Sequence, residues 1–449
     1  MTENAIQGAV QEAKFPKARV WSINKKHLVF QPNWGWAFAF CFFILALRNE
    51  LHEVFYPLLY NEDGRQIFAN FYNEHAFKNI FYFYAGYIRI FPNLVGYLLH
   101  FFPLPIIPAL YALVSLTFTA FVYSLFYRVM DHVFDNRWFA FYATLLIIAL
   151  PQANFEFVGT LMYQIWHCVI ALFILTFLPL PEKAWLRNLQ IVFMHILIWT
   201  HPFSFLTLPF YFYRVFRQPE HRWENGVFVV SILSYFMFAV IHYPLHWDSL
   251  PFYLPTLMSR VGAEVVVGPY NRGWLIYMGI TNIFGVMVFL LTGVIIWFFR
   301  KELKTREKWF LIFLSYFILV PLAASILGRD LNDYYHLLRG SPRYTYISRL
   351  ALLMLGLSAL FFLYQKSKIF RKTHWALIVL VLWINSNSSI LYHTPVQEGK
   401  DILDYIAYID ENKLDCEKGI EKFYYFRRGA WQIPGAPGDW SIPANLCRH

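Results

Sequence analysis

The sequence predicts an all-α polytopic membrane protein with about eleven transmembrane helices, and three observations lead to this fold class. Of the 449 residues, 58% are hydrophobic and only 15% are charged, whereas a soluble protein has about 25% charged residues. Apolar stretches near bilayer-crossing length recur along the chain. Lys and Arg gather in every second connection between these stretches, which is the pattern of cytoplasmic loops.

The positions of the first and last apolar stretches divide the chain into three parts. Residues 1–32 are polar and basic, and such a segment is expected to stay in the cytoplasm. Residues 33–391 form the transmembrane domain, and residues 392–449 form a small tail on the periplasmic side. The first span, residues 33–47, is interpreted as a retained anchor, because no small-residue cleavage site follows it.

A long outer loop over residues 48–104 follows the first span. Two amphipathic helices are expected in it, at 67–83 and 86–102, lying in the membrane interface. Further outer loops are expected at 244–273 and 328–348. The other ten expected spans are residues 106–127, 139–150, 161–178, 189–199, 203–213, 227–243, 274–299, 309–327, 350–364 and 375–391.

The short spans 189–199 and 203–213 are expected to form a compact hairpin whose tip, Thr200-His201-Pro202, contains a helix-breaking proline. Cys41 and Cys168 fall inside apolar spans and are interpreted as packing residues. Cys416 and Cys447 lie in the tail. On the periplasmic side these two residues are a candidate disulfide.

The charge balance excludes several classes of function. The net charge is +10, which in a soluble protein would point to nucleic acid, but here the basic residues lie in inner loops and no nucleic-acid motif is found. The sequence contains no phosphate loop and no dinucleotide glycine fingerprint, so a soluble nucleotide donor is not expected. No His, Cys or carboxylate spacing matches a metal site.

The outer loops combine carboxylates with arginines, as transfer from a phosphate-linked donor requires. Glu62 and Asp63 are adjacent at the head of the first outer loop. Adjacent residues do not face the same way on a helix, so one of them is expected to take a proton from the acceptor hydroxyl and the other to orient the site. Asp63 is favoured as the base, and Glu62 remains an alternative.

The run from Arg329 to Arg349 places several arginines where the positive-inside rule expects few. His336, Arg339 and Arg343 are therefore candidates for binding the donor phosphate, because guanidinium groups match phosphate oxygens. For any one of these residues, the alternative is an ordinary solvated loop charge.

Polar residues near the outer end of the span at 161–178 are candidates for binding the acceptor or the sugar. They are Glu156, Gln164, Trp166 and His167, joined by His201 at the hairpin tip. Polar side chains at this depth usually face protein or a water-filled cavity. The alternative for His167 is an interior histidine held by a hydrogen bond.

The order of a first span, a long acidic outer loop, many spans and a small tail resembles the GT-C fold of integral-membrane glycosyltransferases. The residues that carry the resemblance match a broad set of bacterial proteins of that fold. They are Glu62-Asp63, Tyr84-Ala85-Gly86-Tyr87 through Phe91-Pro92 and Leu94, Glu156 through Gly159 with Thr160, Gln164 and Trp166, then His201-Pro202-Phe203, and Arg343-Tyr344.

The resemblance implies an inverting enzyme of the bacterial inner membrane. Such enzymes take a sugar from a polyprenyl-phosphate carrier on the periplasmic face and pass it to a cell-envelope glycan or glycolipid, such as O-antigen or lipopolysaccharide. The base role falls on Asp63 or Glu62, and Arg343 beside Tyr344 becomes the donor-phosphate candidate. Metal-dependent members need a further acidic motif in a later outer loop. Asp330 with Asp333 could supply one, but Asp248 and Glu264 match equally well, so no obligatory cofactor is expected and a divalent metal remains the alternative.

Two other functions use similar substrates. An O-antigen polymerase or ligase relies on Arg and His in large outer loops late in the chain, whereas here the long acidic loop comes early. A transporter or flippase would carry charged residues or broken helices near the membrane midplane and often repeated halves, and the expected spans show neither. The transferase is therefore the preferred function.

Overall fold

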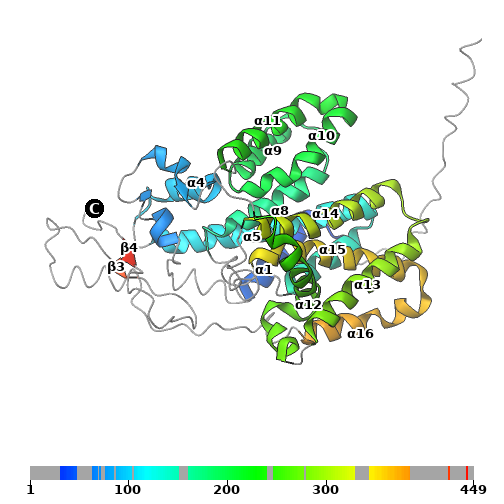
Figure 1. The fold of residues 1–449 in the computed structure, drawn as a ribbon. Coiled ribbons are helices and arrows are strands. Elements are labelled where there is room, and N and C mark those ends of the chain that lie inside the picture. The colour runs from blue at the N-terminus through cyan, green and yellow to red at the C-terminus, as the bar shows by residue number, and fades with distance from the viewer. Residues whose placement is uncertain are drawn as a thin grey trace, which may run out of the picture.

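The computed structural model describes most of the helical part of the chain. The described residues are 31–47, 63–68, 70–71, 76–84, 87–103, 106–150, 160–239, 246–277, 280–328, 343–384, 423–424 and 441–442. These ranges contain thirteen α-helices, which confirms the all-α class (Figure 1). Four helices are long and apolar enough to cross a membrane: α5 (Ile107–Phe134), α13 (Thr281–Phe299), α14 (Thr305–Leu327) and α15 (Arg343–Lys366).

Each of the eleven apolar segments expected as spans overlaps a described helix, but several of these helices are short. The remaining seven are α1 (Trp34–Leu45), α6 (Arg137–Ala149), α8 (Gln164–Phe177), α9 (Ala184–Ile198), α10 (Leu208–Arg217), α11 (Arg222–Ala239) and α16 (Lys368–Ile384). A helix of 12 residues, such as α1, rises only about 18 Å, against a hydrocarbon core of about 30 Å. The apolar helices indicate a membrane protein, and length alone identifies four spans.

Helices α1, α5, α6 and α8 form the first part of the bundle. Helix α5 packs against each of the other three. The side chains of Asn33 and Asn136 accept the amide hydrogens of Trp36, at 3.1 Å, and Phe139, at 2.9 Å. Asparagine at these positions begins α1 and α6, because it satisfies an amide group that has no partner within the helix.

The first outer loop departs from the two amphipathic helices expected at 67–83 and 86–102. Its described parts are a single π turn, η3 (Asp63–Phe68), the α-helical residues 70 and 71, a 3₁₀ turn, η4 (Phe77–Phe81), an antiparallel pair of two-residue strands, β1 (Phe83–Tyr84) and β2 (Tyr87–Ile88), and the helix α4 (Ile90–Leu99). The first expectation is therefore wrong, and the second holds only for α4.

Close packing explains the short elements. Ile67, Phe68 and Phe71 are buried in a small apolar cluster with Ile80. A side chain on Gly96 of α4 would collide with Ile67. The short turns bring these apolar groups against α4 at a distance that only glycine permits.

The expected order of helix, turn and helix over residues 189–213 is confirmed, and both helices pack against α11 (Arg222–Ala239). Helix α9 ends at Ile198, and the 3₁₀ turn η6 (Pro202–Thr207) leads into α10. Pro202 stands at the first position of η6, where its missing amide hydrogen costs nothing. A short turn, η7 (Pro219–His221), then connects α10 to α11, and α10 and α11 pack together.

Most of the segment expected as an outer loop at 244–273 is a helix, α12 (Ser249–Tyr277), which is not among the four helices long and apolar enough to cross a membrane. The helix is interrupted at Gly268, whose φ of 77° is left-handed and suits glycine. Helix α12 crosses α13 with the backbones in close contact: a Cβ atom on Gly262 would collide with the backbone of Gly285. Prolines and charged residues made this stretch resemble a loop, but tertiary packing holds it as a helix.

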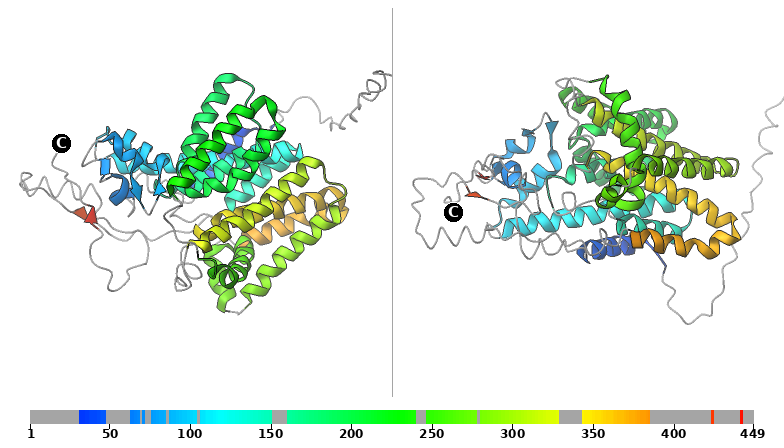
Figure 2. Two further views of the ribbon diagram at one scale, coloured as in Figure 1. Left: turned by 45° about the horizontal axis from the view of Figure 1, so that its top comes forward. Right: turned by 60° about the horizontal axis from the view of Figure 1, so that its bottom comes forward.

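The bundle has two distinct ends (Figure 1). The turns that connect α13 to α14 and α15 to α16 lie together at one end, and both carry Lys and Arg. The first outer loop with α4 lies at the opposite end, as the other two views also show (Figure 2). In the tail, β3 (Phe423–Tyr424) pairs with β4 (Ser441–Ile442), and β4 lies against η3, so the described part of the tail joins the first-loop end.

Candidate functional site

Asp63 is clamped to the start of α8 by both of its carboxylate oxygens. Oδ2 accepts the amide hydrogen of Leu161 at 2.8 Å, and Oδ1 accepts that of Met162 at 2.6 Å. Only 3% of Asp63 is exposed. Leu161 and Met162 form the turn that precedes α8, whose N-cap is Tyr163. Asp63 therefore fixes this turn from a position about 100 residues earlier in the chain, and negative charge is favourable near the N-terminal end of a helix.

Arg89 reaches the same point from the other side of the first loop. It stands between β2 and α4, and its Nη1 donates to the Met162 sulfur at 2.7 Å. Its guanidinium carbon lies 5.0 Å from the centre of the Tyr87 ring, within the range of a cation–π contact. Arg89 is 5% exposed, so a buried cation and a buried carboxylate both contact the Leu161–Met162 segment.

Trp166 and His201 complete this cluster. Trp166 lies one helical turn after Met162, and its ring centre is 4.9 Å from that of His201. His201 also contacts the ring of Tyr87, at 5.2 Å. The indole nitrogen of Trp166 is buried and has no hydrogen-bond partner among the described residues. We call Asp63, Arg89, Trp166 and His201 the Met162 cluster.

His201 is a neutral member of the cluster. Its Nδ1 accepts the amide hydrogen of Phe203 at 3.1 Å, which caps η6. Burial, with a smaller contribution from the positive charge of Arg89, lowers the pKa of His201 to about 3. The imidazole is therefore unprotonated near neutral pH, so it can accept hydrogen bonds but is a poor proton donor.

Gln164 and His167 lie on the same helix but hold the bundle together. Gln164 is fully buried; it donates to the Thr160 carbonyl at 3.1 Å and accepts from the Thr119 hydroxyl at 3.2 Å. His167 Nε2 lies 3.0 Å from the Tyr346 hydroxyl, which in turn lies 2.9 Å from the Tyr123 hydroxyl. This chain joins α8, α15 and α5, and it agrees with the interpretation of His167 as an interior, hydrogen-bonded histidine.

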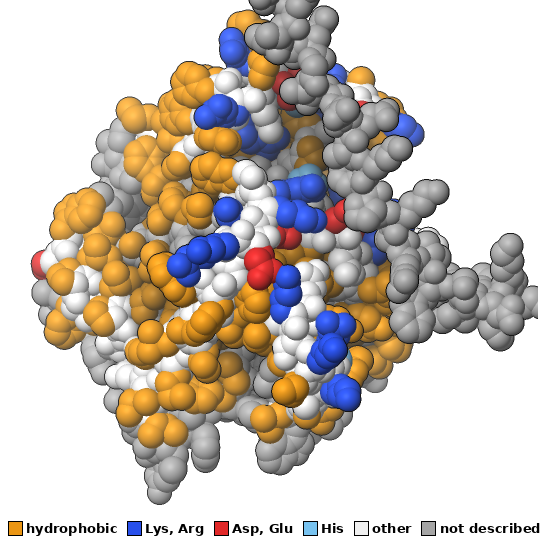
Figure 3. All heavy atoms as spheres, turned by 90° about the vertical axis from the view of Figure 1, so that its right-hand side faces the viewer, with side chains coloured by type: hydrophobic (Ala, Val, Ile, Leu, Met, Phe, Trp, Pro, Cys, Tyr) orange, Lys and Arg blue, Asp and Glu red, His pale blue; other side chains and the backbone are white. Residues whose placement is uncertain are grey.

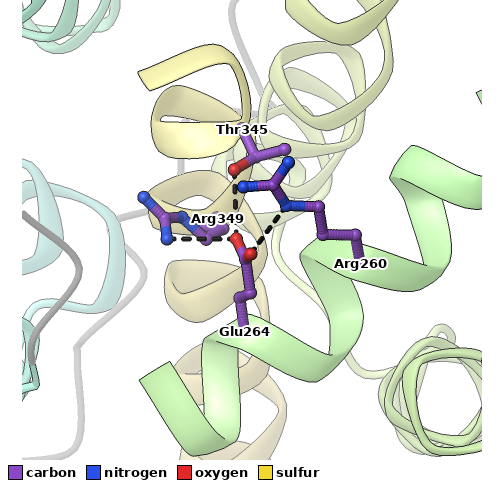
Figure 4. Close-up of polar contacts among 4 residues, drawn as sticks. All are labelled: Arg260, Glu264, Thr345 and Arg349. Atoms are coloured by element: carbon purple, nitrogen blue, oxygen red, sulfur yellow. Dashed lines mark hydrogen bonds and ion pairs between the residues drawn. The ribbon is translucent and has the colours of Figure 1, made fainter. Parts of the chain in front are cut away.

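A second buried polar cluster joins α12 to α15 (Figure 4). Glu264 accepts from Arg260 Nε at 2.7 Å, from Arg349 Nη1 at 3.1 Å and from the Thr345 hydroxyl at 3.1 Å. Arg260 stands four residues before Glu264 on α12, on the same helical face. Arg349 and Glu264 are both 0% exposed. We call these four residues the Glu264 cluster.

The structure brings together some of the sequence-predicted residues. Asp63, Trp166 and His201 meet in the Met162 cluster, while Gln164 and His167 point into helix contacts. Arg343 and Tyr344 form the first turn of α15, and their side chains are not described. Predicted residues that lie outside the described part of the chain are Glu62, Glu156, His336, Arg339, Cys416 and Cys447. Cys41 and Cys168 are buried free thiols, as expected.

Two further contributors, Arg89 and Arg349, were not predicted from the sequence. Arg89 is one of four basic residues in the predicted outer loop 48–104, and nothing local distinguishes it from the other three. Arg349 closes the Arg-rich run after Arg329 but was not selected. Tyr346 and Tyr123 gave no signal, because their contact spans 223 residues of the chain. Among the described residues, no three His, Cys, Asp or Glu side chains gather as metal ligands would.

No protein-family model, curated protein or solved structure matches the chain.

Proposed function

We propose that the chain is an inverting glycosyltransferase of the GT-C type, in the inner membrane of a bacterium. It takes a sugar from a polyprenyl-phosphate-linked donor and passes it to a cell-envelope glycan or glycolipid on the periplasmic side. One observation carries the proposal: the first-loop carboxylate Asp63 is buried beside Arg89, Trp166 and His201 at one end of an apolar helical bundle.

The arrangement of charge supports the proposed orientation. The basic turns after α13 and α15 lie at the end opposite the first loop (Figure 1). By the positive-inside rule these turns face the cytoplasm, so the Met162 cluster faces the periplasm. In the proposed topology, all eleven apolar segments cross the membrane, the N-terminal segment is cytoplasmic and the tail is periplasmic.

The proposed reaction needs a base, a nucleophile and a stabilised leaving group. A carboxylate takes the proton of the acceptor hydroxyl, whose oxygen forms a bond to the anomeric carbon. The bond between that carbon and the phosphate oxygen breaks, and the polyprenyl phosphate leaves with the electron pair. Attack opposite the leaving group inverts the anomeric carbon.

Asp63 and Glu62 remain the two candidates for the base. Both oxygens of Asp63 already accept backbone amide hydrogens, so its lone pairs are partly committed. This geometry fits a positioning role for Asp63, in which it fixes the head of the first loop. In that division of roles, Glu62 is the proton acceptor.

Arginines at the proposed periplasmic end are the candidates for the leaving phosphate. Arg343, with His336, Arg339 and Tyr344 nearby in sequence, keeps this proposed role. Guanidinium groups held in place stabilise a developing phosphate charge without reorganising during the reaction. Arg349, less than two turns further along the same helix, is 0% exposed and pairs with Glu264, so it holds α15 in place and does not contact the donor.

Aromatic groups of the Met162 cluster are proposed to bind the sugar. The unpartnered indole N–H of Trp166 offers a hydrogen-bond donor in a buried site, and the rings of Trp166 and His201 offer flat apolar faces. Gln164, His167 and Glu156 are proposed as neighbouring acceptor contacts. Their described contacts give Gln164 and His167 mainly a supporting role.

The test is mass spectrometry of the cell-envelope glycans of host cells with and without the gene. The proposal expects loss of one sugar residue from one glycan, restored by the wild-type gene. A change in chain length with unchanged composition would indicate a polymerase or ligase instead. Accumulation of a complete lipid-linked glycan would indicate a flippase.

Variants then separate the two carboxylates. Glu62→Gln is expected to abolish sugar addition with normal protein abundance, while Asp63→Asn lowers both sugar addition and thermal stability, because an amide offers only one acceptor oxygen. Arg343→Ala is expected to raise the donor concentration needed for transfer. Near-wild-type transfer by both carboxylate variants would refute the first loop as the source of the base.

A further inference from the structure

A large apolar cavity lies on the bundle away from the two polar clusters. Its volume is about 570 Å³, within the size range of ligand pockets, about 300–1,000 Å³. It runs along α6 and is closed by side chains of α1, α15 and α16. Representative wall residues are Ile44, Ala143, Leu146, Leu360, Phe361 and Ile378. Because these helices are apolar bundle helices, the cavity faces the interior of the membrane.

One end of the cavity is polar and aromatic. Asn136 caps the start of α6, Tyr364 lies in the last turn of α15, and His374 lies in the second turn of α16; all three line the cavity. The ring centres of Tyr364 and His374 are 5.0 Å apart. Trp138 and Trp375, also lining this region, are 44% and 57% exposed. Exposed tryptophans of this kind are typical of the membrane–water interface.

Basic residues adjoin that end in sequence. Lys368, Arg371 and Lys372 occupy the first turns of α16, which lines the cavity, and all three are exposed. Arg137 follows Asn136, but it lines a separate pocket together with Asp131. Arg371 and His374 are three residues apart on α16, so they share a helical face. Asp131 and Asp135 are the nearby acidic residues in sequence, and Glu302 is paired with Lys366. Lys and Arg side chains gather on this end of the bundle among apolar ones (Figure 3).

We propose that this cavity binds one anionic glycerophospholipid from the cytoplasmic leaflet. An acyl chain lies along α6, and the phosphate group lies beside Lys368 and Arg371 on α16. Helix α6 has 13 residues and is about 20 Å long, which exceeds one leaflet of the hydrocarbon core, about 15 Å. The cavity therefore accommodates the depth of one acyl chain.

Charge complementarity selects the headgroup. Basic pockets between transmembrane helices on the cytoplasmic side bind anionic headgroups, whereas a zwitterionic headgroup gains less from the same cations. The site is distinct from the donor site, because the donor phosphate is proposed at the opposite end of the bundle. The inference rests on the bundle lying in a bilayer, and it does not depend on transferase activity.

The test is native mass spectrometry of the purified full-length protein, titrated with dioleoyl-phosphatidylglycerol or dioleoyl-phosphatidylcholine. The expected result is one phosphatidylglycerol bound at least tenfold more tightly than phosphatidylcholine. Lys368→Gln combined with Arg371→Gln is expected to remove this preference, and Lys301→Gln combined with Lys304→Gln, in another basic turn, is the matched control.

A second variant tests the cavity itself. Leu360→Trp fills the cavity from α15. It is expected to lower the affinity of the protein for both lipids at least tenfold. Its control is Leu290→Trp, at a 61% exposed position on α13, which is expected to leave binding unchanged. Equal affinity of the wild-type protein for both lipids, or equal effects of the variants and their controls, would overturn the proposal. Selective retention of a polyprenyl phosphate in place of phosphatidylglycerol would overturn it as well.

Discussion

Replacement of Glu264 by glutamine removes one negative charge from the contact between α12 and α15 and changes little in shape. The carboxylate accepts hydrogen bonds from Arg260, Arg349 and Thr345. Arg349 is 0% and Arg260 is 5% exposed, so neither guanidinium group can turn into water without moving its helix. The amide of glutamine keeps one acceptor oxygen and places an NH₂ group against a cationic donor.

The expected cost is large because a buried charge loses its counter-charge. Breaking a buried ion pair by removing one partner costs about 3–5 kcal/mol. Glu302 provides the matched control, because it forms an ion pair with Lys366 in which the side chains are 49% and 55% exposed. Exposed pairs contribute about 0–1 kcal/mol. Glu264→Gln is therefore expected to cost at least 2 kcal/mol more than Glu302→Gln (a margin of roughly 2–5 kcal/mol from the same two ranges).

The assay is denaturant-induced unfolding of the two variants and the wild-type protein in detergent micelles, followed by tryptophan fluorescence. The free energy of unfolding is compared at one pH and one detergent concentration. If Glu264→Gln and Glu302→Gln lower it by the same amount, the Glu264 cluster does not hold α12 against α15, and the reasoning fails.

Three further predictions concern the folded state. As pH decreases from about 6.5 toward 3, the wild-type protein is expected to lose up to about 1.4 kcal/mol more stability per pH unit than His201→Asn, because His201 has a pKa of about 3 when folded and about 6.5 when unfolded. The Asn variant can still cap η6, and equal slopes for the two proteins in unfolding experiments would contradict this prediction. Gly285→Ala is expected to destabilise the protein by about 1–3 kcal/mol, because its Cβ would collide with the backbone of Ser259. The control Gly293→Ala, on the same helix, meets open space and should be neutral or stabilising. Similar melting temperatures for the two variants would refute the close crossing of α12 and α13. Tyr346→Phe loses the hydrogen bonds to both His167 and Tyr123, so it should lower the melting temperature more than Tyr123→Phe, which leaves the contact between Tyr346 and His167 in place. The reverse order would show that these three side chains do not form a continuous chain of hydrogen bonds.

Hydrophobic patterning located the helices well, but the polar contacts between them depended on the three-dimensional fold. All eleven apolar segments overlap helices, because long apolar stretches have no other stable form in a membrane. Helix α12 was missed because Glu264 and Arg260 appear as loop charges in sequence and become compatible with a buried helix only when Arg349 approaches from α15. Two amphipathic helices were expected in the first loop, but Ile67 and its neighbours pack as short turns against Gly96.

The candidate site was also predicted only in part from the sequence. Asp63, Trp166 and His201 were selected from local sequence features, and the fold gathers them around Met162. Arg89 was not selected, because its partner Met162 is 73 residues away and an apolar methionine gives no hint of a polar neighbour. Two residues that are far apart in the sequence leave no repeating pattern that would indicate their contact, so the contact is seen only in the folded structure.

The clamp on Asp63 also sets an order of events during synthesis. Leu161 follows Asp63 by 98 residues, and ribosomes add about 5–20 residues per second, so the partner amide emerges roughly 5–20 seconds later. Helices α5 and α6 are made in that interval and have to be placed before α8 arrives. A nascent chain that stalls before Leu161 leaves Asp63 hydrated and the apolar face beneath α4 without its final neighbour. The first loop is thus completed by a segment that does not yet exist when the loop leaves the ribosome.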